Sequence, residues 1–286
     1  MPPNSPAPLT QTLLGVDFTC APSRRKPIVV ARGRCVAGLL RLDAAEAVLS
    51  LEHFEALLSE SGPWLGAFDF PFGLPRAFVQ DLALGHNAQE VMTALRRRCP
   101  QRMDFRALVD AWGGTQPAGQ RLLHRATDKA APGLSSTSPL QTRYVPVGFM
   151  YSEGFSRLLD AGVHLPGLRA ADPERTALEG YPALLAQALI GRRSYKNDAG
   201  AERLLARKDI VEALEQGRTP LGLRLKLSPA QAGELVADAS GDRLDAVLCL
   251  MQAAWASTQP RLGQPEQLDA VEGWITSAGL ARIGGD

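Results

Sequence analysis

Short apolar runs separated by polar segments predict a mixed α/β fold for this chain. Three runs rich in apolar or β-branched residues come first, and the short links between them favour an antiparallel meander. A fourth apolar run ends in Asp69, and a fifth strand is expected further along the chain. The five strands are expected at residues 13–18, 28–31, 35–42, 64–69 and 176–180. Together they predict a mixed five-stranded sheet flanked by helices.

Apolar residues at intervals of three and four predict helices between and after these strands. The first helix is expected over residues 43–61, with Asp43 as its N-cap and Phe54 and Leu57 on its apolar face. Pro182 suits the first position of a helix, because a backbone N–H at that position would have no partner within the helix and proline lacks one. The other helices are expected at residues 77–84, 88–98, 149–161, 183–191, 201–216, 228–239 and 242–256.

Residues 76–171 are expected to form an insertion made of helices and loops. Within it, residues 113–146 are polar and rich in Gly, Pro, Ser and Thr. A loop this long in a compact domain is uncommon unless it has a function. We therefore expect it to lie over or beside the functional site, with Arg125 directed toward that site. The Pro-rich residues 1–12 are expected to be a disordered tail, which leaves residues 13–286 as a single domain.

The composition is that of an ordinary globular protein. Apolar residues make up 45% of the chain and charged residues 21%, with a formal net charge of +1. This balance neither demands nor excludes a nucleic-acid partner, so any phosphate-binding residues must be concentrated locally. No apolar run reaches the roughly 18 residues that a membrane span needs, and the N-terminal residues lack the pattern of a secretory signal. The cytoplasm, with reduced cysteines, is the expected location.

Several common site chemistries have no sequence signature here. The four cysteines show no C-x-x-C spacing and the four histidines lie far apart, which argues against a local zinc site. The chain also lacks the G-x-S-x-G, G-x-x-x-x-G-K-[ST] and G-x-G-x-x-G motifs. The histidines have no evident nucleophile as a partner, so a structural role is expected for each.

Two acids follow apolar strands and are the first candidates for chemistry. Asp17 ends the first predicted strand and Asp69 ends the fourth. If these strands are adjacent and parallel, both acids emerge at the same carboxyl edge, where open α/β sheets place their ligand sites. Two converging carboxylates repel each other unless a cation or proton joins them, and Mg²⁺ or Mn²⁺ is the natural cation for oxygen ligands. The alternative is that each acid only caps a turn.

Three further acids are candidates on other elements. Asp242 and Asp245 are three residues apart, so a helix places them on one face, and the apolar surroundings of that closing helix predict that it is buried. The alternative is that Asp242 caps this helix, in a pattern that resembles a capping box, while Asp245 binds metal. Glu179 ends the last predicted strand and is either a further ligand or a simple turn acid.

Basic residues near these acids are candidates for contacts with phosphate. Arg24 and Arg25, which precede Lys26, lie in the turn after the Asp17 strand. Lys196 follows Tyr195 between two predicted helices. The alternative for each of these basic groups is a solvated surface.

Four short motifs occur together in this order along the chain. They are Gly15-Val16-Asp17, Phe68-Asp69-Phe70-Pro71-Phe72-Gly73-Leu74-Pro75, Glu179-Gly180-Tyr181-Pro182 and Asp242-Arg243-Leu244-Asp245-Ala246, with Arg125-Ala126-Thr127-Asp128 between the second and the third. With these motifs the chain resembles the domain-of-unknown-function family 429, a group of predicted ribonuclease-H-like nucleases. The resemblance extends from about Gly15 to Trp255.

The resemblance implies a ribonuclease-H-like sheet with a metal-dependent acidic site. It points to Asp17, Asp69, Glu179 and Asp245 as catalytic residues, and to Asp242 together with three of these, Asp17, Asp69 and Asp245, as ligands of Mg²⁺ or Mn²⁺. It also gives Arg125 a place among the residues that bind substrate. The expected function is hydrolysis of phosphodiester bonds in nucleic acid, with Asp17 as the best candidate to bridge two metal ions.

Two alternatives remain open from the sequence. Asp17-Phe18-Thr19 has a faint similarity to the phosphate loop of actin-like phosphotransferases, although such enzymes generally need two copies of the fold and no second copy is visible. The other alternative is a binding module without catalysis that keeps the fold and uses the insertion to hold a partner.

Overall fold

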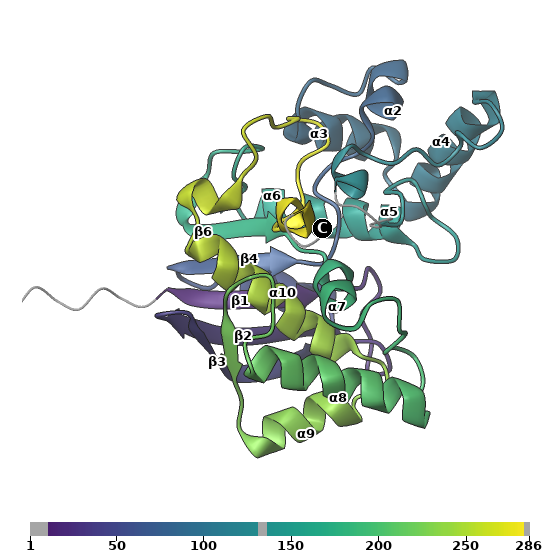
Figure 1. Ribbon diagram of the computed structural model, residues 1–286. Coiled ribbons are helices and arrows are strands. Elements are labelled where there is room, and N and C mark those ends of the chain that lie inside the picture. The colour runs from purple at the N-terminus through teal and green to yellow at the C-terminus, as the bar shows by residue number, and fades with distance from the viewer. Residues whose placement is uncertain (1–10, 131–135, 283–286) are drawn as a thin grey trace, which may run out of the picture.

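A mixed sheet of seven strands forms the centre of the protein (Figure 1). The computed structural model describes residues 11–130 and 136–282, so the first ten residues of the predicted tail lie outside it, while Thr12 already belongs to a strand. The strands are β1 (Thr12–Asp17), β2 (Ile28–Val36), β3 (Leu39–Val48), β4 (Trp64–Phe68), β5 (Val163–His164), β6 (Asp172–Glu179) and β7 (Arg224–Lys226). Their order across the sheet is β5-β6-β4-β1-β2-β3-β7.

The sheet combines an antiparallel meander with parallel strands. Strands β1, β2 and β3 pair antiparallel, whereas β4 lies parallel to β1, and β6 lies parallel to β4. The five expected strands correspond to β1, β2, β3, β4 and β6. The two additional strands, β5 and β7, are two and three residues long and occupy the two edges. Such short segments carry too little periodicity to be predicted.

Helices cover both faces of this sheet and fill the insertion. The α-helices are α1 (Leu51–Leu58), α2 (Arg76–Asp81), α3 (Ala88–Arg98), α4 (Arg102–Thr115), α5 (Val147–Met150), α6 (Ser156–Asp160), α7 (Pro182–Ile190), α8 (Ala201–Glu215), α9 (Pro229–Ala237) and α10 (Asp242–Ser257). A π-helical turn, η2 (Tyr151–Phe155), joins α5 to α6, and the 3₁₀ turns are η1 (Thr127–Lys129), η3 (Pro260–Gly263) and η4 (Ala278–Arg282). No helix within the described ranges is long and apolar enough to span a membrane.

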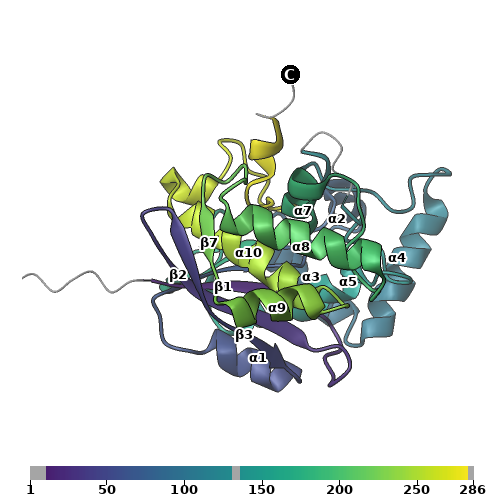
Figure 2. The same ribbon diagram turned by 60° about the horizontal axis from the view of Figure 1, so that its bottom comes forward.

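Side-chain alternation along the strands divides the core into two layers. Leu14 and Val16 of β1 belong to a cluster with Phe54 of α1 and with apolar residues of the insertion. Leu13 of β1 and Leu65 of β4 belong to a second cluster, which includes residues of α7, α8, α9 and α10. Figure 2 shows α8, α9 and α10 laid across one face of the strands, and Figure 1 shows α2 to α6 gathered beside β6 and β4. The buried helix α10 therefore packs directly on the centre of the sheet.

The meander turns later than the sequence predicts. Strand β2 continues through the expected turn at residues 32–34, where a register shift between Arg32 and Gly33 marks a β-bulge. The turn comes instead at Ala37 and Gly38, both with positive φ. A bulge keeps a strand paired through residues that locally resemble a turn, which is why the local pattern gave the wrong position.

The predicted first helix begins too early. Residues 43–48, which favour a helix by composition, pair with β2 as the second half of β3. Helix α1 begins at Leu51, and Ser50 rather than Asp43 is its N-cap, with its side chain accepting from the N–H of His53 at 3.2 Å. The neighbouring strand thus outweighs a modest local helix propensity. The expected helices from α7 to α10 are confirmed, including Pro182 at the first position of α7.

Candidate metal centre

Two aspartates stand side by side at the carboxyl ends of β1 and β4. Val16 of β1 and Phe68 of β4 are direct partners in the parallel register. Asp17 ends β1 and Asp69 follows β4, and the backbone N–H of Asp69 donates to the carbonyl of Val16 at 2.9 Å. The expected placement of both acids at one edge of the sheet is therefore confirmed.

The alternation of the strands turns both carboxylates toward the same face. In β1, Leu13 and Asp17 are four residues apart, and so are Leu65 and Asp69 along β4, so each pair lies on one face. Both leucines belong to the cluster that packs against α10. The two aspartates are accordingly on the side of the sheet that α10 covers.

A glycine lets α10 come close enough to complete the cluster. A Cβ on Gly15 of β1 would lie 2.0 Å from the carbonyl oxygen of Ala246 and 2.1 Å from the nitrogen of Leu250. Asp245 precedes Ala246, so this contact brings its carboxylate to the strand ends. One carboxylate oxygen each of Asp17, Asp69 and Asp245 lies within 4.8 Å of the other two. The expected convergence of these three residues, here called the aspartate triad, is confirmed.

The electrostatics of the triad fit a divalent cation. Asp17 is 6% exposed, and its Oδ2 has no hydrogen-bond partner in the described part of the chain. Burial, with the charges of Asp69 and Asp242, raises the pKa of Asp17 to about 8. Burial also raises the pKa of Asp69 to about 6, although the nearby lysines oppose this. Repelling carboxylates with an unpartnered buried oxygen suit the hard, oxygen-seeking ions Mg²⁺ and Mn²⁺.

Asp245 has two partners from the segment between α7 and α8. The hydroxyl of Tyr195 donates to its Oδ1 at 2.6 Å, and the ammonium of Lys196 forms an ion pair with its Oδ2. Burial raises the pKa of Tyr195, so this hydroxyl keeps its proton as a donor. Lys196, predicted as a phosphate contact, thus pairs with a member of the triad, whereas the sequence did not single out Tyr195. The sequence signal that could have pointed to Tyr195 is its position directly before Lys196.

Asp242 lies beside the triad rather than within it. Its Oδ1 accepts from the ammonium of Lys26 at 2.5 Å. The alternative of Asp242 as an N-cap is wrong, because Gly241 occupies that position with a φ of 80°. The carboxylate of Asp238 takes the capping role and accepts from the N–H of Arg243 at 3.0 Å. Asp242 therefore holds Lys26 next to the triad.

Glu179 faces away from the triad. Its neighbour Leu178 belongs to the cluster under α10, so alternation places Glu179 on the opposite face of β6. Both of its carboxylate oxygens are engaged by Arg125, at 2.5 and 2.8 Å. The residue that faces the same way as Asp69 is Gly180, which directly follows β6. Because side chains alternate between the two faces of a strand, the sequence alone predicts that Glu179 faces the opposite way from Leu178.

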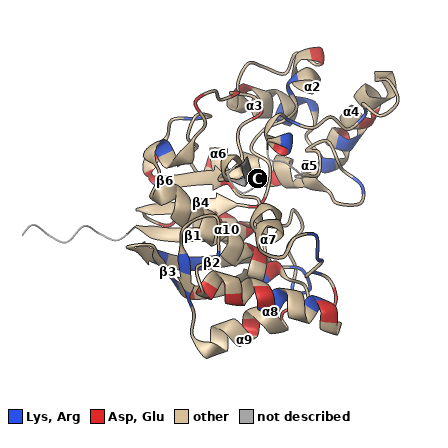
Figure 3. Cartoon of the chain, in the orientation of Figure 1, with Lys and Arg blue, Asp and Glu red and all other residues tan. Residues whose placement is uncertain are grey.

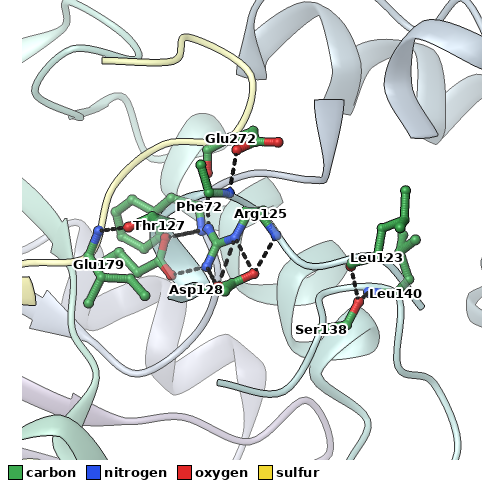
Figure 4. A network of polar contacts seen from close by, with 11 residues as sticks. Phe72, Leu123, Arg125, Thr127, Asp128, Ser138, Leu140, Glu179 and Glu272 are labelled. Atoms are coloured by element: carbon green, nitrogen blue, oxygen red, sulfur yellow. Dashed lines mark hydrogen bonds and ion pairs between the residues drawn. The ribbon is translucent and has the colours of Figure 1, made fainter. Parts of the chain in front are cut away.

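A buried ionic network ties the insertion to the sheet beside the triad (Figure 4). Arg125 is 2% exposed and donates to Glu179, to Asp128 at 2.7 Å and to the carbonyl of Glu272 at 3.0 Å. The N–H of Phe72 donates to Glu179 at 2.8 Å. The side chain of Arg125 thus points to Glu179 and Asp128 rather than to the triad, and these two carboxylates are its anionic partners.

Comparison of the chain with protein-family models, with curated proteins and with solved structures gives no match.

The basic residues near the strand ends differ in whether they reach the acids at or beside the triad. Arg24 and Arg25, the expected phosphate contacts, are exposed in the turn after β1, whereas the side chain of the next residue, Lys26, reaches Asp242. Selecting the two arginines missed Lys26, although it lies in the same turn. In Figure 3, basic and acidic residues are interspersed over α8, in keeping with the net charge of +1. The positive charge relevant to the site is therefore local and comes from Lys26 and Lys196.

Proposed function

We propose that this protein is a nuclease that hydrolyses phosphodiester bonds with bound Mg²⁺ or Mn²⁺. The observation that carries the proposal is the aspartate triad, in which three carboxylate oxygens lie within 4.8 Å of one another. The unpartnered Oδ2 of buried Asp17 supports a ligand at this point, because a buried acceptor without a partner is costly. A divalent cation would satisfy it and remove the repulsion within the triad.

The arrangement of the sheet also supports the proposal. We take the order β3-β2-β1-β4-β6, an antiparallel meander followed by two parallel strands, as support for the ribonuclease-H-like sheet that the resemblance to family 429 implies. Two triad members follow adjacent parallel strands and the third comes from α10. This placement agrees with what the resemblance to family 429 implies for Asp17, Asp69 and Asp245.

The residues around the triad have separable roles in this proposal. Asp17, Asp69 and Asp245 hold the cation through oxygen atoms. Bound there, the cation supplies Lewis-acid stabilisation of charge on the phosphate and lowers the pKa of a bound water. Lys26 and Lys196 place two positive charges next to the carboxylates, where they attract a substrate phosphate. Tyr195 orients Asp245 through its hydroxyl.

One observation favours a binding module without catalysis as the second candidate. The ammonium of Lys196 already pairs with Asp245, and that of Lys26 with Asp242. Two lysines beside the carboxylates offset part of their repulsion without any metal. In a module without catalysis these ion pairs would persist. In a nuclease, the ammonium of Lys196 would leave the carboxylate of Asp245 and bind the substrate phosphate instead.

Metal titration combined with a cleavage assay separates the two candidates. Calorimetry with Mn²⁺ should show saturable binding to the wild type and much weaker binding to Asp17→Asn and Asp69→Asn. End-labelled single-stranded and duplex DNA and RNA should be cleaved by the wild type only with Mn²⁺ or Mg²⁺. Asp160→Asn, at an exposed aspartate on α6, is the matched control and should behave as the wild type. Cleavage that survives in Asp17→Asn would come from a contaminating nuclease. The binding module without catalysis would then be the function that remains.

A further inference from the structure

A small pocket opens directly beside the aspartate triad. Asp69 belongs both to the triad and to the wall of this pocket, which encloses about 160 Å³. Sites for drug-sized ligands usually enclose at least about 300 Å³. The pocket therefore has room for one small group of a larger ligand whose remaining part lies at the triad.

The pocket combines apolar walls with a few polar groups. Its apolar lining comes from both sides, with Phe70 after β4, Val147 and Met150 of α5, and Ile275 near the C-terminus. Tyr181, after β6, also lines it. Burial, with the charges of Asp69 and Asp128, raises the pKa of Tyr181 to about 12, so its hydroxyl stays protonated at neutral pH. The aromatic rings of Phe70 and Tyr181 in this lining suit a planar group with some hydrogen-bonding edges.

The charged residues in the wall exclude a second anion. Arg125 faces the pocket, but its guanidinium is shared between Glu179 and Asp128, which together carry one more charge than it does. No cation is left over in this network to bind phosphate. The pocket therefore favours an uncharged group, in contrast to the lysine-flanked triad next to it.

We propose that this pocket receives one unpaired nucleobase of a single-stranded nucleic acid whose phosphate lies at the aspartate triad. The inference rests on the proposed nuclease function and names its substrate class. A nucleobase is planar, uncharged and polar at its edges, and it is joined through its sugar to the phosphate that the triad would hold. A base inserted between these walls cannot remain paired, so the pocket selects single strands or bases turned out of a duplex.

An exposed aromatic side chain near the pocket agrees with this substrate. Tyr144 is 92% exposed, and the next residue, Val145, lines the pocket and is 53% exposed. Proteins that hold single strands commonly stack bases on exposed aromatic rings. Tyr144 is thus available to stack the base that follows the enclosed one.

Filling the pocket tests the proposal. Val147→Phe adds a ring to the pocket wall, and Val36→Phe makes the same change at an exposed position at the end of β2. Binding of a fluorescein-labelled single-stranded oligonucleotide is measured by anisotropy, with Ca²⁺ in place of Mn²⁺. We expect Val147→Phe to weaken this binding about tenfold and Tyr144→Ala to weaken it several-fold, while Val36→Phe has no effect. Thermal melts check that each variant is folded.

Cleavage provides the second arm of the test. With Mn²⁺, the wild type should cleave the single strand faster than the same strand annealed to its complement. One abasic site next to the cleaved bond should slow cleavage about as much as Val147→Phe does. Equal cleavage of the single strand, the duplex and the abasic strand by wild type and Val147→Phe would overturn the base pocket and leave the nuclease intact.

The two proposals fail in distinguishable ways. If no substrate is cleaved but Val147→Phe still weakens single-strand binding, the result supports the base pocket and contradicts the nuclease function. If the wild type does not bind the single strand at all, or binds it as tightly after Val147→Phe, the base pocket is wrong. Parallel DNA and RNA oligonucleotides show which sugar the site accepts.

Discussion

Asp17 and Asp69 share one position on two adjacent strands, because the residues before them, Val16 and Phe68, are paired in parallel register. Their carboxylates therefore leave the sheet together toward α10, where Asp245 meets them. The charge of Asp69 is one of the causes that raise the pKa of Asp17.

Replacing Asp17 with Asn should separate metal binding from folding. The change keeps the shape of the side chain and removes a negative charge that Asp69 and Asp242 repel. Without metal, the variant should be as stable as the wild type or slightly more stable at pH 8. The rise in Tm that Mn²⁺ causes in the wild type should be lost. An unchanged Mn²⁺ effect in the variant would show that Asp17 is not a ligand.

The stability of the metal-free protein should fall as the pH rises toward 8. The folded state raises the pKa of Asp17 from its usual 3.8 to about 8, so it binds a proton that the unfolded chain releases. The resulting stabilisation is complete below about pH 4 and is lost as the pH rises through about 8. The Tm of Asp17→Asn minus that of the wild type should therefore increase across this range in EDTA. A difference independent of pH would contradict the raised pKa.

Lys196→Met should affect metal binding and cleavage in opposite directions. The ammonium of Lys196 competes with a cation for Asp245, so its removal should tighten Mn²⁺ binding several-fold. The loss of a positive charge beside the phosphate should slow cleavage, on the order of tenfold. Lys208→Met, at an exposed residue of α8, is the control for the loss of charge. Weaker Mn²⁺ binding in Lys196→Met would show that the lysine supports the metal site instead of competing with it.

Gly15→Ala should destabilise the protein strongly through the contact between β1 and α10. The new Cβ would lie 2.0 Å from the carbonyl oxygen of Ala246, and neither backbone can move without disturbing the core. Gly233→Ala on α9 places a Cβ in open space and should stabilise the protein by up to about 1 kcal/mol. Urea unfolding of both variants compares them. Similar stabilities would mean that α10 does not pack as closely as described.

Arg125→Met should destabilise the fold by about 3–5 kcal/mol, because it leaves Glu179 and Asp128 buried without their counter-ion. Arg143→Met breaks an exposed pair with Asp110 and should change the stability by less than about 1 kcal/mol. Urea unfolding measures both. A small effect at Arg125 would show that water or a proton compensates the two carboxylates.

The local pattern of the chain determined most of the elements and the main acids of the site. Helices α7 to α10 and strand β4 follow from periodicity and from Pro182, since the signals lie within a few residues. Asp17 and Asp69 could be selected because each directly follows an apolar strand. Two strands of this type, once parallel and adjacent, must deliver both residues to one edge.

Tertiary structure decided which charged residues meet. Glu179, Asp242 and Lys26 all lie near predicted strand or helix ends, but their partners come from more than 50 residues away in the chain, and Lys26 pairs across 216 residues. The bulge in β2 and the close approach of α10 to Gly15 likewise depend on neighbouring backbones. The sequence determines the chemistry of each residue and the local spacing between residues. Only packing selects among the many long-range pairings that such residues allow, because the free energy of each pairing comes from burial and partners that local sequence does not contain.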